Sequence, residues 1–390
     1  KKNSKKHTTE VSVLIKKSFG EISKVNYQIL DSDIESPFMQ YDFLYALEKS
    51  KSVSIDNGWE PLHFVNEENG NLNGFMPLYK KYNSTCEFVF DHSWSHALEQ
   101  AGRRYYPKLL SAIPFTPCAS EKILGKNKGI KDRIIKNIQD YMTQEAIESW
   151  HVLFPNEATS KILNNYNFIE RFGCKFIWKN RNFKNFDDFL EIFTARQRKT
   201  IKAERKKCSD AKVSFQIIES KDITYADWSI FYELYCQTYL DRWQKPYLER
   251  EFFDLLTRDS SSCQPILFFA LQDNKVIGGS LCFKNEDTLY GRHWGSIKKI
   301  DSLHFETCYY QGIDYCINNK LKFFDPGVQG EHKIRRGFEP EITSSLHYFL
   351  RNDLREAVKI FCNKEKSGIL QYKKSCEEYT PIKKEYRIIL

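Results

Sequence analysis

The sequence predicts an α/β protein of two similar domains, each a mixed, mostly antiparallel sheet flanked by helices. Three observations predict this class. The 390 residues exceed what one hydrophobic core usually organises, and 41% of them are hydrophobic. Segments with the period of a helix alternate with short apolar segments of strand composition. The order strand, helix, antiparallel strands, helix, strand occurs in each half, which indicates a duplicated α/β unit.

The first half begins with a basic segment. Residues 1–35 are predicted to form a tail and a first strand at 25–30, and the Lys-rich start is either a disordered tail or the remnant of an organelle transit peptide. A first domain is predicted over 36–185, where Ser36 suits the cap of a helix and Pro37 its first position. The further elements expected are, in order, a hairpin at 61–81, a strand at 86–90, a helix at 130–149, a strand at 151–154, a short helix at 161–166 and a pair of strands at 168–180.

A second domain is predicted over 186–390. Its expected elements are, in order, a helix at 186–208, a strand at 213–218, helices at 228–243 and 246–258, a meander of strands at 265–296, a helix at 304–320 and strands at 322–324 and 344–350. The helix at 304–320 is amphipathic, because Phe305, Cys308 and Ile313 fall on one face. This domain also contains the densest group of ionisable residues.

Composition bounds the partners and the environment of the chain. The net charge of +8 favours an anionic partner such as a phosphate, a nucleic acid or a lipid headgroup. The 11 cysteines include no C-x-x-C pair, which favours free thiols in a reducing compartment over disulfides or a zinc ribbon. No segment approaches the roughly 18–20 apolar residues of a membrane span. A cytoplasmic protein is expected, or one of an organelle stroma or matrix if the basic start is a transit remnant.

The segment 323–340 combines glycine turns with ionisable side chains. Gly327 and Gly330 suit a backbone that turns tightly or approaches a ligand closely. Proton-transfer groups and cations follow at Glu331, His332, Lys333, Arg335 and Arg336. A segment that only turns the chain would use Gly, Asn or Pro without this charge. A functional loop is therefore predicted here, with a solvated turn as the alternative.

Several motifs resemble those of the FemAB-like family, a branch of the GNAT (N-acetyltransferase) superfamily linked to peptidoglycan biosynthesis and recognition. They are ARQRKTIKAERKK, WQKPYLEREFF, LYGRHWG, LHFETCYYQGIDYCI and GVQGEHKIRRGFEP in the second half and EFVFDHSWSHALEQAGRRYYPKLLSAIPFTP in the first. The resemblance covers residues 36–360 and implies two tandem GNAT-like domains. More distantly, the layout is similar to the Fem ligases, which move an amino acid from aminoacyl-tRNA onto a peptidoglycan precursor. The residues that stand where those ligases have an Asp-x-Gly-Gly turn, a Lys and a Gly-Phe element are Asp325, Gly327, Lys333, Gly337 and Phe338.

The resemblance implies acyl transfer to an amine, which requires a proton acceptor, stabilisation of a carbonyl oxygen as charge develops on it, and alignment of the reactants. Lys333 is the expected partner of the developing oxyanion or of a donor phosphate, and a salt bridge to Glu331 or Glu339 is the alternative. The candidate proton acceptors, which the sequence does not rank, are Asp325, Glu331 and His332. Substrate-binding residues are expected in the same segment at Gly327, Gln329, Gly330, Arg335 and Arg336.

Two groups beside this segment are also predicted to bind substrate. Arg292, His293 and Trp294 end an apolar strand, where open α/β sheets bind ligands, and an ordinary strand end at the surface is the equal alternative. His304 and Glu306 begin a helix, whose N-terminus suits an anion.

Cations that could hold a donor phosphate occur in two places. Where GNAT enzymes that use acyl-CoA carry a Q/R-x-x-G-x-G/A loop, this chain has WGSIKKIDSLHFE, which contains Lys298 and Lys299 but no glycine cradle. That departure favours another activated donor, such as aminoacyl-tRNA. A basic helix is expected upstream, with Arg198, Lys202 and Arg205 on one face that could contact several phosphates. A solvated helix face is the equal alternative.

The first half contributes a cluster of aromatic and charged residues. Asp91, His92, Trp94 and His96 form DHSWSH, in which the two histidines have the spacing of helical metal ligands but lack a third ligand. The resemblance makes the cluster a cleft wall that binds substrate. Tyr106 lies in a following run of Arg, Tyr and Lys that could hold a phosphate or a sugar, or pack at a domain interface.

The leading hypothesis is an N-acyltransferase that moves an aminoacyl or acyl group from an activated donor, aminoacyl-tRNA in preference, to an amine of a small molecule or peptide. No metal and no tightly bound cofactor are expected. The active cleft is expected between the open strands of the two sheets, lined by 91–106, 292–306 and 325–338. An acyl-CoA-dependent N-acetyltransferase and a non-catalytic scaffold that binds a cell-wall or nucleic-acid ligand are the alternatives.

Overall fold

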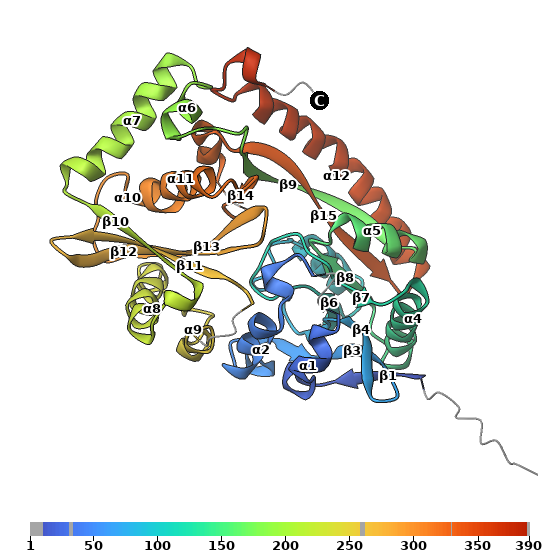
Figure 1. Cartoon of the computed structure of the whole chain (residues 1–390). Coiled ribbons are helices and arrows are strands. Elements are labelled where there is room, and N and C mark those ends of the chain that lie inside the picture. The colour runs from blue at the N-terminus through green and yellow to red at the C-terminus, as the bar shows by residue number, and fades with distance from the viewer. Residues whose placement is uncertain (1–10, 31–33, 258–261, 329, 388–390) are drawn as a thin grey trace, which may run out of the picture. The chain divides into compact units, whose positions relative to one another are not determined.

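The computed structural model describes residues 11–30, 34–257, 262–328 and 330–387. The chain forms two compact units, each with sheets and covering helices (Figure 1). The first unit comprises Lys1–Phe115, Ala119–Arg171 and Ser344–Cys362, and the second comprises Thr116–Cys118, Phe172–Thr343 and Asn363–Leu390. The chain passes between the units inside strand β9, Ile169–Lys179, and again inside strand β15, Glu339–Phe349.

The first unit contains two sets of strands. One has the order β1-β3-β4-β7 and is antiparallel, and the other has the order β15-β8-β6-β5-β2, in which only β6 and β8 run parallel. The strands are β1 Val11–Lys16, β2 Trp59–Pro61, β3 His63–Glu68, β4 Asn71–Met76, β5 Tyr79–Lys81, β6 Lys108–Ser111, β7 Leu124–Gly125 and β8 Ser149–Leu153. The helices are α1 Lys24–Gln28, α2 Tyr41–Lys49, α3 His92–Gln100, α4 Lys128–Gln144 and α5 Glu157–Leu163. Ile134 and Ile138 of α4 belong to the same buried core as Trp150 and Val152 of β8.

Three expectations for the first half are wrong. Residues 25–30 form no strand, because most of them lie in helix α1. Residues 86–90 form no strand either, since Cys86 and Phe88 both have a φ of 62°, far from the extended region. Conversely, a strand does occupy 11–16, where a tail was expected, and it pairs with β3 along its whole length.

The expected pair of strands at 168–180 is the single strand β9. Gly173 lies inside this strand, and a Cβ at that position would lie 2.7 Å from Oγ1 of Thr343. The glycine therefore allows another segment to approach closely and does not turn the chain.

The second unit contains one set of strands with the order β10-β11-β12-β13-β14-β9, in which only β13 and β14 run parallel. These strands are β10 Ser214–Glu219, β11 Pro265–Gln272, β12 Lys275–Lys284, β13 Thr288–Ser296 and β14 Phe323–Asp325. The helices are α6 Phe186–Leu190, α7 Ala195–Asp210, α8 Tyr225–Leu240, α9 Arg250–Leu255, α10 Leu303–Phe305 and α11 Gln311–Asn318. A π-helical segment, η7 Glu306–Tyr310, joins α10 to α11, and a 3-10 helix, η8 Glu331–Arg336, follows β14.

The element types predicted for the second half are confirmed, with two changes. The helix expected at 186–208 is divided into α6 and α7, because the side chain of Thr194 caps α7 by accepting a hydrogen bond from the backbone of Gln197. The strand expected at 344–350 starts earlier, at Glu339, and is β15. A long helix that the sequence analysis did not anticipate, α12 Asn352–Glu378, follows it.

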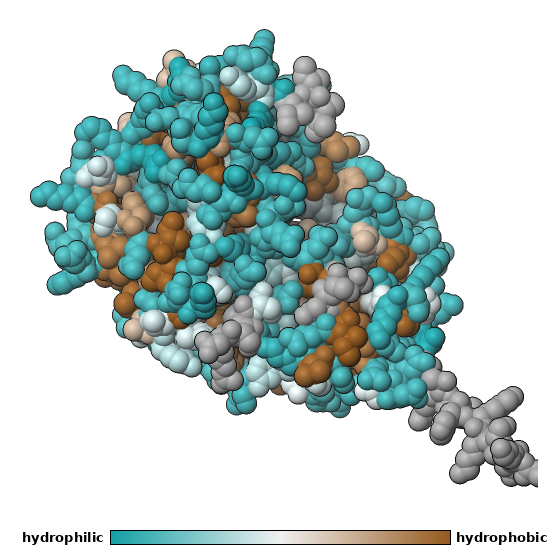
Figure 2. Space-filling model, viewed as in Figure 1, coloured by the Kyte–Doolittle hydropathy of each residue, from teal (hydrophilic) through white to brown (hydrophobic). Residues whose placement is uncertain are grey.

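Hydrophilic and apolar side chains are unevenly distributed over the surface. Hydrophilic side chains cover most of the face shown in Figure 2, and apolar side chains gather in separate patches. None of the helices within the described ranges combines the length and the apolar composition that a membrane crossing requires.

Candidate active site

Strands β13 and β14 separate near their carboxyl ends. They pair in parallel as far as Tyr290 and Asp325, where β14 stops, while β13 continues to Ser296. The register between β12 and β13 shifts at Arg292, which makes this residue the extra one of a β-bulge. The two strands diverge at the carboxyl ends of a parallel pair, the place where open α/β sheets bind ligands.

The turn after β14 is held by Asp325. Its carboxylate is buried and accepts hydrogen bonds from Nζ of Lys175 at 2.6 Å and from the backbone N–H of Gly327 at 3.0 Å. Burial lowers the pKa of Lys175, but the Asp325 carboxylate more than offsets this, so that the pKa is raised. Since both oxygens of Asp325 are engaged, this residue is suited to fix the turn and less suited than the other two candidates to accept a proton.

Lys333 lies buried against the same turn, with only 2% of its surface exposed. Its ammonium donates to the carbonyl oxygen of Gly327 at 2.8 Å and to that of Pro326 at 3.4 Å. Burial lowers the pKa of Lys333 to about 8, although the nearby Asp325 carboxylate acts in the opposite direction. The result is a lysine that is cationic at neutral pH and held by neutral carbonyl groups.

The salt bridge considered for Lys333 is not formed. Within the described part of the chain, Glu331 accepts a hydrogen bond from Tyr372 at 2.7 Å, and Glu339 pairs with Arg181 at 2.7 Å. The two carboxylates that competed for Lys333 in the sequence analysis are thus bound to other groups.

The predicted glycine turns are confirmed. Gly327 has a φ of 90° and Gly330 a φ of 109°, both in the region that favours glycine. A Cβ at Gly330 would lie 2.3 Å from Cε1 of His332, so this glycine also lets the imidazole close against the backbone. Gln329 lies outside the described residues.

Rings from three elements meet beside the turn. His332 of η8 is exposed, and its Nε2 lies 2.9 Å from the hydroxyl of Tyr309. His304 of α10 makes an edge contact with Trp294 of β13 at 5.4 Å between ring centroids, and its centroid lies 6.4 Å from that of His332. Burial lowers the pKa of His304 to about 4, and burial together with neighbouring cations lowers the pKa of His332. His332 is therefore a neutral and accessible imidazole.

The predicted group at the end of β13 is divided between the two faces of the strand. Trp294 turns toward α10, whereas His293 contacts the rings of Tyr235 and Tyr247 at 5.2 and 6.2 Å. Successive side chains of a strand point to opposite faces, which explains the division. Burial lowers the pKa of His293 well below its ordinary value, so this residue is a neutral packing partner of α8.

Arg336 anchors η8 to neighbouring elements. Its guanidinium donates to Glu204 of α7 at 2.7 Å and to the backbone oxygen of His332 at 2.8 Å, and it stacks on the ring of Phe305 at 3.4 Å. A cavity of about 700 Å³ lies beside this group. Four predicted site residues line it, namely Glu331, His332, Arg335 and Arg336.

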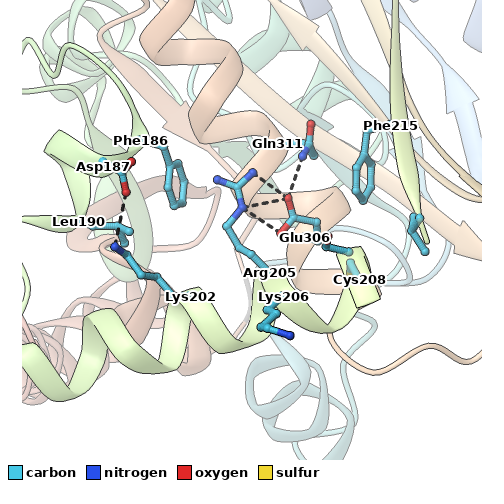
Figure 3. A pocket seen from close by; sticks show the side chains of 12 residues that line it. Phe186, Asp187, Leu190, Lys202, Arg205, Lys206, Cys208, Phe215, Glu306 and Gln311 are labelled. Atoms are coloured by element: carbon cyan, nitrogen blue, oxygen red, sulfur yellow. Dashed lines mark hydrogen bonds and ion pairs between the residues drawn. The ribbon is translucent and has the colours of Figure 1, made fainter. Parts of the chain in front are cut away.

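A second cavity of about 610 Å³ lies along α7 (Figure 3). Arg205 donates through Nε and Nη2 to Glu306 at 2.9–3.2 Å and through Nη2 to Asp314 at 2.8 Å. Glu306 is buried in the π-helical segment, and Lys202 lies 3.6 Å from Asp187 at the rim. The predicted substrate residue Glu306 and the predicted donor residue Arg205 thus form one ion pair, which joins α7 to the π-helical segment.

The remaining predicted donor cations are Arg198, Lys298 and Lys299. Arg198 pairs with Glu191 at 2.6 Å, Lys298 donates to the side-chain oxygen of Gln272 at 2.8 Å, and Lys299 is exposed in the loop after β13. Helix α7 therefore has the predicted basic face, but Arg198 and Arg205 on this face already pair with acidic side chains.

The predicted cluster of the first half mostly turns inward. Asp91 and Trp94 are buried, and the guanidinium of Arg171 lies 5.0 Å from the Trp94 ring. His92 is exposed, and the hydroxyl of the half-buried Tyr106 lies 2.6 Å from Oγ of Ser84. Four residues of this cluster and its surroundings are predicted to bind substrate, and of these only His92 and Tyr106 are accessible to solvent. No group of three His, Cys, Asp or Glu side chains in the described ranges has the geometry of a metal site.

Asp91 belongs to a buried charge network that the sequence analysis missed. The fully buried Lys108 donates to Asp91 at 2.5 Å and to Glu87 at 2.7 Å. The hydroxyl of Tyr105 donates to Asp91 at 2.5 Å and lies 3.1 Å from Nε2 of His151. Burial raises the pKa of Glu87 to about 7 and lowers that of His151 to about 3. The YYPK motif was the signal that could have indicated Lys108.

Other functional candidates in the second unit also escaped the sequence analysis. Lys175, Tyr309 and Glu204 each contact a predicted site residue from a distant part of the chain. Lys175 precedes Asp325 by 150 residues and lies in a strand, so no local pattern indicates the pair. Only Glu204 had a local signal, as the single carboxylate in the basic run 196–207.

Solved structures with the same arrangement of elements define the fold class. The chain is similar to FemX, with 10% identity, a TM-score of 0.52 and coverage of 87% of this chain and 98% of FemX. It is also similar to a conserved protein of unknown function from Bacteroides thetaiotaomicron VPI-5482, with 10% identity, a TM-score of 0.51 and coverage of 87% and 100%. A third relative is the C-terminal domain of a protein named as a lysylphosphatidylglycerol synthetase from Agrobacterium fabrum, with 8% identity, a TM-score of 0.51 and coverage of 89% and 97%. These likenesses confirm the predicted fold class, a mixed α/β protein of sheets flanked by helices.

The sequence itself identifies the family. Residues 18–384 match the FemAB-like family, which is described as peptidoglycan biosynthesis/recognition. The chain belongs to this family, which confirms the resemblance seen in its motifs. A search of curated proteins finds no match.

Proposed function

We propose that this acyltransferase of the FemAB-like family moves an aminoacyl or acyl group from an activated donor onto an amine, and that aminoacyl-tRNA is the favoured donor. The observation that carries the proposal is Lys333. It is a buried lysine with a pKa of about 8, held by the carbonyl groups of a glycine turn at the point where β13 and β14 separate. A cation in such a position can stabilise negative charge that develops on a carbonyl oxygen in the transition state.

The reaction that fits these residues is direct attack by the acceptor amine. Its nitrogen forms a bond to the carbonyl carbon of the donor, the carbonyl oxygen becomes an oxyanion beside the ammonium of Lys333, and the bond from the carbon to the donor oxygen then breaks. His332 accepts the proton that the amine loses and then donates it to the leaving oxygen of the donor, which departs as a hydroxyl group. His332 suits this role because its pKa is lowered, its ring is exposed and Nε2 contacts the hydroxyl of Tyr309.

Two buried ion pairs support the proposed catalytic groups without touching the reacting atoms. The pair of Lys175 and Asp325 fixes the turn that binds Lys333, and the pair of Arg336 and Glu204 fixes the 3-10 helix that carries His332 and Lys333. Both are therefore positioning pairs in this proposal, because the alignment of reacting groups contributes much of the rate enhancement.

Two features support aminoacyl-tRNA as donor. The loop between β13 and α10 contains exposed Lys298 and Lys299 and no glycine cradle for a pyrophosphate. The cavity along α7 has Lys202 and Lys206 among its lining residues, and cations of this kind contact phosphates of a nucleic acid. The separation of β13 from β14 is compatible with acyl-CoA as well, so an acyl-CoA-dependent N-acetyltransferase is the second candidate.

The test compares the two donors directly. The full chain is incubated with a tRNA pool charged with radiolabelled amino acids, or with radiolabelled acetyl-CoA, in the presence of primary amines that include amino sugars and lysine-containing peptides. We expect amine-dependent transfer from the charged tRNA, and we expect Lys333→Met to lower its rate about 10²–10³-fold. Lys161→Met, which removes an exposed cation of the first unit to which no role in donor binding is assigned, is the matched control and should retain the rate. Full activity of Lys333→Met would contradict the role of the lysine, and transfer from acetyl-CoA alone would replace the favoured donor by the second candidate.

The compartment is part of the same proposal. All 11 cysteines are free thiols, and several are buried in the cores. Free thiols are typical of a reducing compartment. We therefore place the protein in the cytoplasm, where aminoacyl-tRNA is also available.

A further inference from the structure

Strand β10, Ser214–Glu219, forms an edge of the sheet in the second unit. It pairs with β11 along its whole length, and no other strand in the described ranges pairs with it. In an antiparallel pair, the backbone groups of alternate residues point away from the partner strand. The outer side of β10 therefore presents a row of N–H and C=O groups that another strand could bind.

This edge lacks the features by which proteins usually protect an edge strand. Its sequence, SFQIIE, contains no Lys, Arg or Pro, and its register with β11 has no bulge. Ile217 is 41% exposed, and Phe215 and Ile218 are half-buried. The one charged residue, Glu219, stands at the end of the strand and pairs with Lys284 at 2.8 Å. Apolar side chains gather in Figure 2 over the region where Figure 1 places β10 and its neighbours.

The sequence of β10 is complementary to itself. If two copies pair antiparallel about a two-fold axis at Gln216, each Phe215 lies opposite an Ile217, and the two Gln216 amides face each other. Ser214 then lies opposite Ile218, and Glu219 lies beyond the apolar pairs. Aromatic residues opposite β-branched residues stabilise neighbouring strands by about 0.2–1 kcal/mol per pair. No two side chains of the same charge lie opposite each other in this pairing of two β10 strands.

We propose that β10 is a self-association surface, at which two copies of this chain join their second-unit sheets by antiparallel pairing of β10 with β10. Such an interface is the same patch on both copies and closes as a two-fold dimer without leaving a free surface for further growth. A strand pair of this length is small compared with the roughly 1,200–2,000 Å² of a standard stable interface. The dimer is therefore weak, with a dissociation constant between micromolar and millimolar. The proposal does not depend on the catalytic roles proposed for Lys333 and His332, which lie in the 3-10 helix after β14.

The basic helix α7 modifies this association. Phe215 lines the same cavity as Lys202 and Lys206 of α7, so pairing of two β10 strands brings the cations of two α7 helices toward the seam. Repulsion between exposed charges is screened by salt. The dimer consequently becomes tighter as the ionic strength rises, which is the opposite of what an association through ion pairs would show.

Sedimentation equilibrium of the full chain tests the proposal over micromolar to millimolar concentration. We expect a reversible monomer–dimer equilibrium for the wild type. Ile217→Lys should weaken it at least tenfold, because it places a charge opposite Phe215 in both halves of the seam. Ile230→Lys is the matched control, since Ile230 is 37% exposed on α8, and it should leave the equilibrium unchanged. A circular-dichroism spectrum and melting curve like those of the wild type would establish that each variant is folded.

Hydrogen exchange locates the contact independently of the substitutions. The amides of residues 214–219 that point away from β11 should exchange more slowly at high than at low protein concentration. A chain that is monomeric throughout the range would refute the proposal, and so would a dimer that Ile217→Lys does not weaken. Slow exchange of these amides at every concentration would also refute it, because another segment of the same chain would then cover the edge.

Discussion

Replacement of Lys108 by Met removes one buried charge and keeps the length of the side chain. Lys108 is fully buried, and its ammonium lies 2.7 Å from Glu87 and 2.5 Å from Asp91. Without it, two carboxylates with only 4% and 3% of their residue surface exposed lose their closest cation. Breaking a buried ion pair in this way typically costs about 3–5 kcal/mol. We expect a loss of this size in the free energy of unfolding of the first unit under mildly alkaline conditions.

The loss should shrink as the pH falls. Burial raises the pKa of Glu87 from 4.5 to about 7. A carboxyl group with a raised pKa binds more protons in the folded than in the unfolded state, so its favourable contribution is present below the unfolded pKa and is lost as the pH rises through the folded pKa. Lys108→Met raises the pKa of Glu87 further, because an opposite charge is removed. At mildly acidic pH the variant therefore holds Glu87 neutral and approaches the wild type.

Native-state hydrogen exchange of the β6 and β8 amides is the appropriate assay, because it reports opening of the first unit separately from the second. Lys161→Met is the control. Its ammonium forms an exposed i,i+4 pair with Glu157, with 73% and 82% of the side chains exposed, and exposed pairs of this kind contribute about 0.3–0.5 kcal/mol. A loss for Lys108→Met no larger than that of the control would refute the network as a stabilising unit. A loss that grows toward acidic pH would refute the assignment of Glu87.

Three further predictions concern the second unit. Because the pKa of Lys333 is about 8, the transfer rate should fall as the pH rises through that value and the ammonium loses its proton. Lys333→Arg should shift this alkaline limb of the pH–rate profile to higher pH. If the limb does not shift, another group causes it. Tyr309→Phe should lower kcat and shift the acid limb by freeing Nε2 of His332, with little change in donor binding; a change in KM alone would make Tyr309 a binding residue. Gly337 has a φ of 85°, and a Cβ there would lie 2.8 Å from a ring, whereas Gly70 has a φ of 78° and a Cβ there would meet nothing within 4 Å. Gly337→Ala should therefore lower the melting temperature clearly more than Gly70→Ala. Equal shifts would mean that backbone strain alone matters at both positions.

Local patterns were sufficient for most of the second unit. The meander β11–β13, helix α8 and the glycine turns at Gly327 and Gly330 follow from apolar periodicity and from the conformational freedom of glycine. The motifs also identified the family, which the match over residues 18–384 confirms. Patterns failed where a segment owes its conformation to distant partners. Strand β1, VSVLIK, directly follows the Lys-rich start that predicts a tail, and it pairs with β3 along its whole length.

The candidate site likewise combines features that local sequence determines with features that depend on distant partners. The sequence by itself determined that Lys333, His332 and two glycines occupy one short segment, since their proximity along the chain is covalent. Only the tertiary structure decided that Asp325 is engaged by Lys175 and that His332 contacts Tyr309. The protonation state of a group depends on the burial and the charges around it, and these are set by residues that meet in space from distant positions in the chain. No local pattern in the sequence distinguishes the three candidate proton acceptors, whereas the two hydrogen bonds that engage Asp325 are seen only in the tertiary structure.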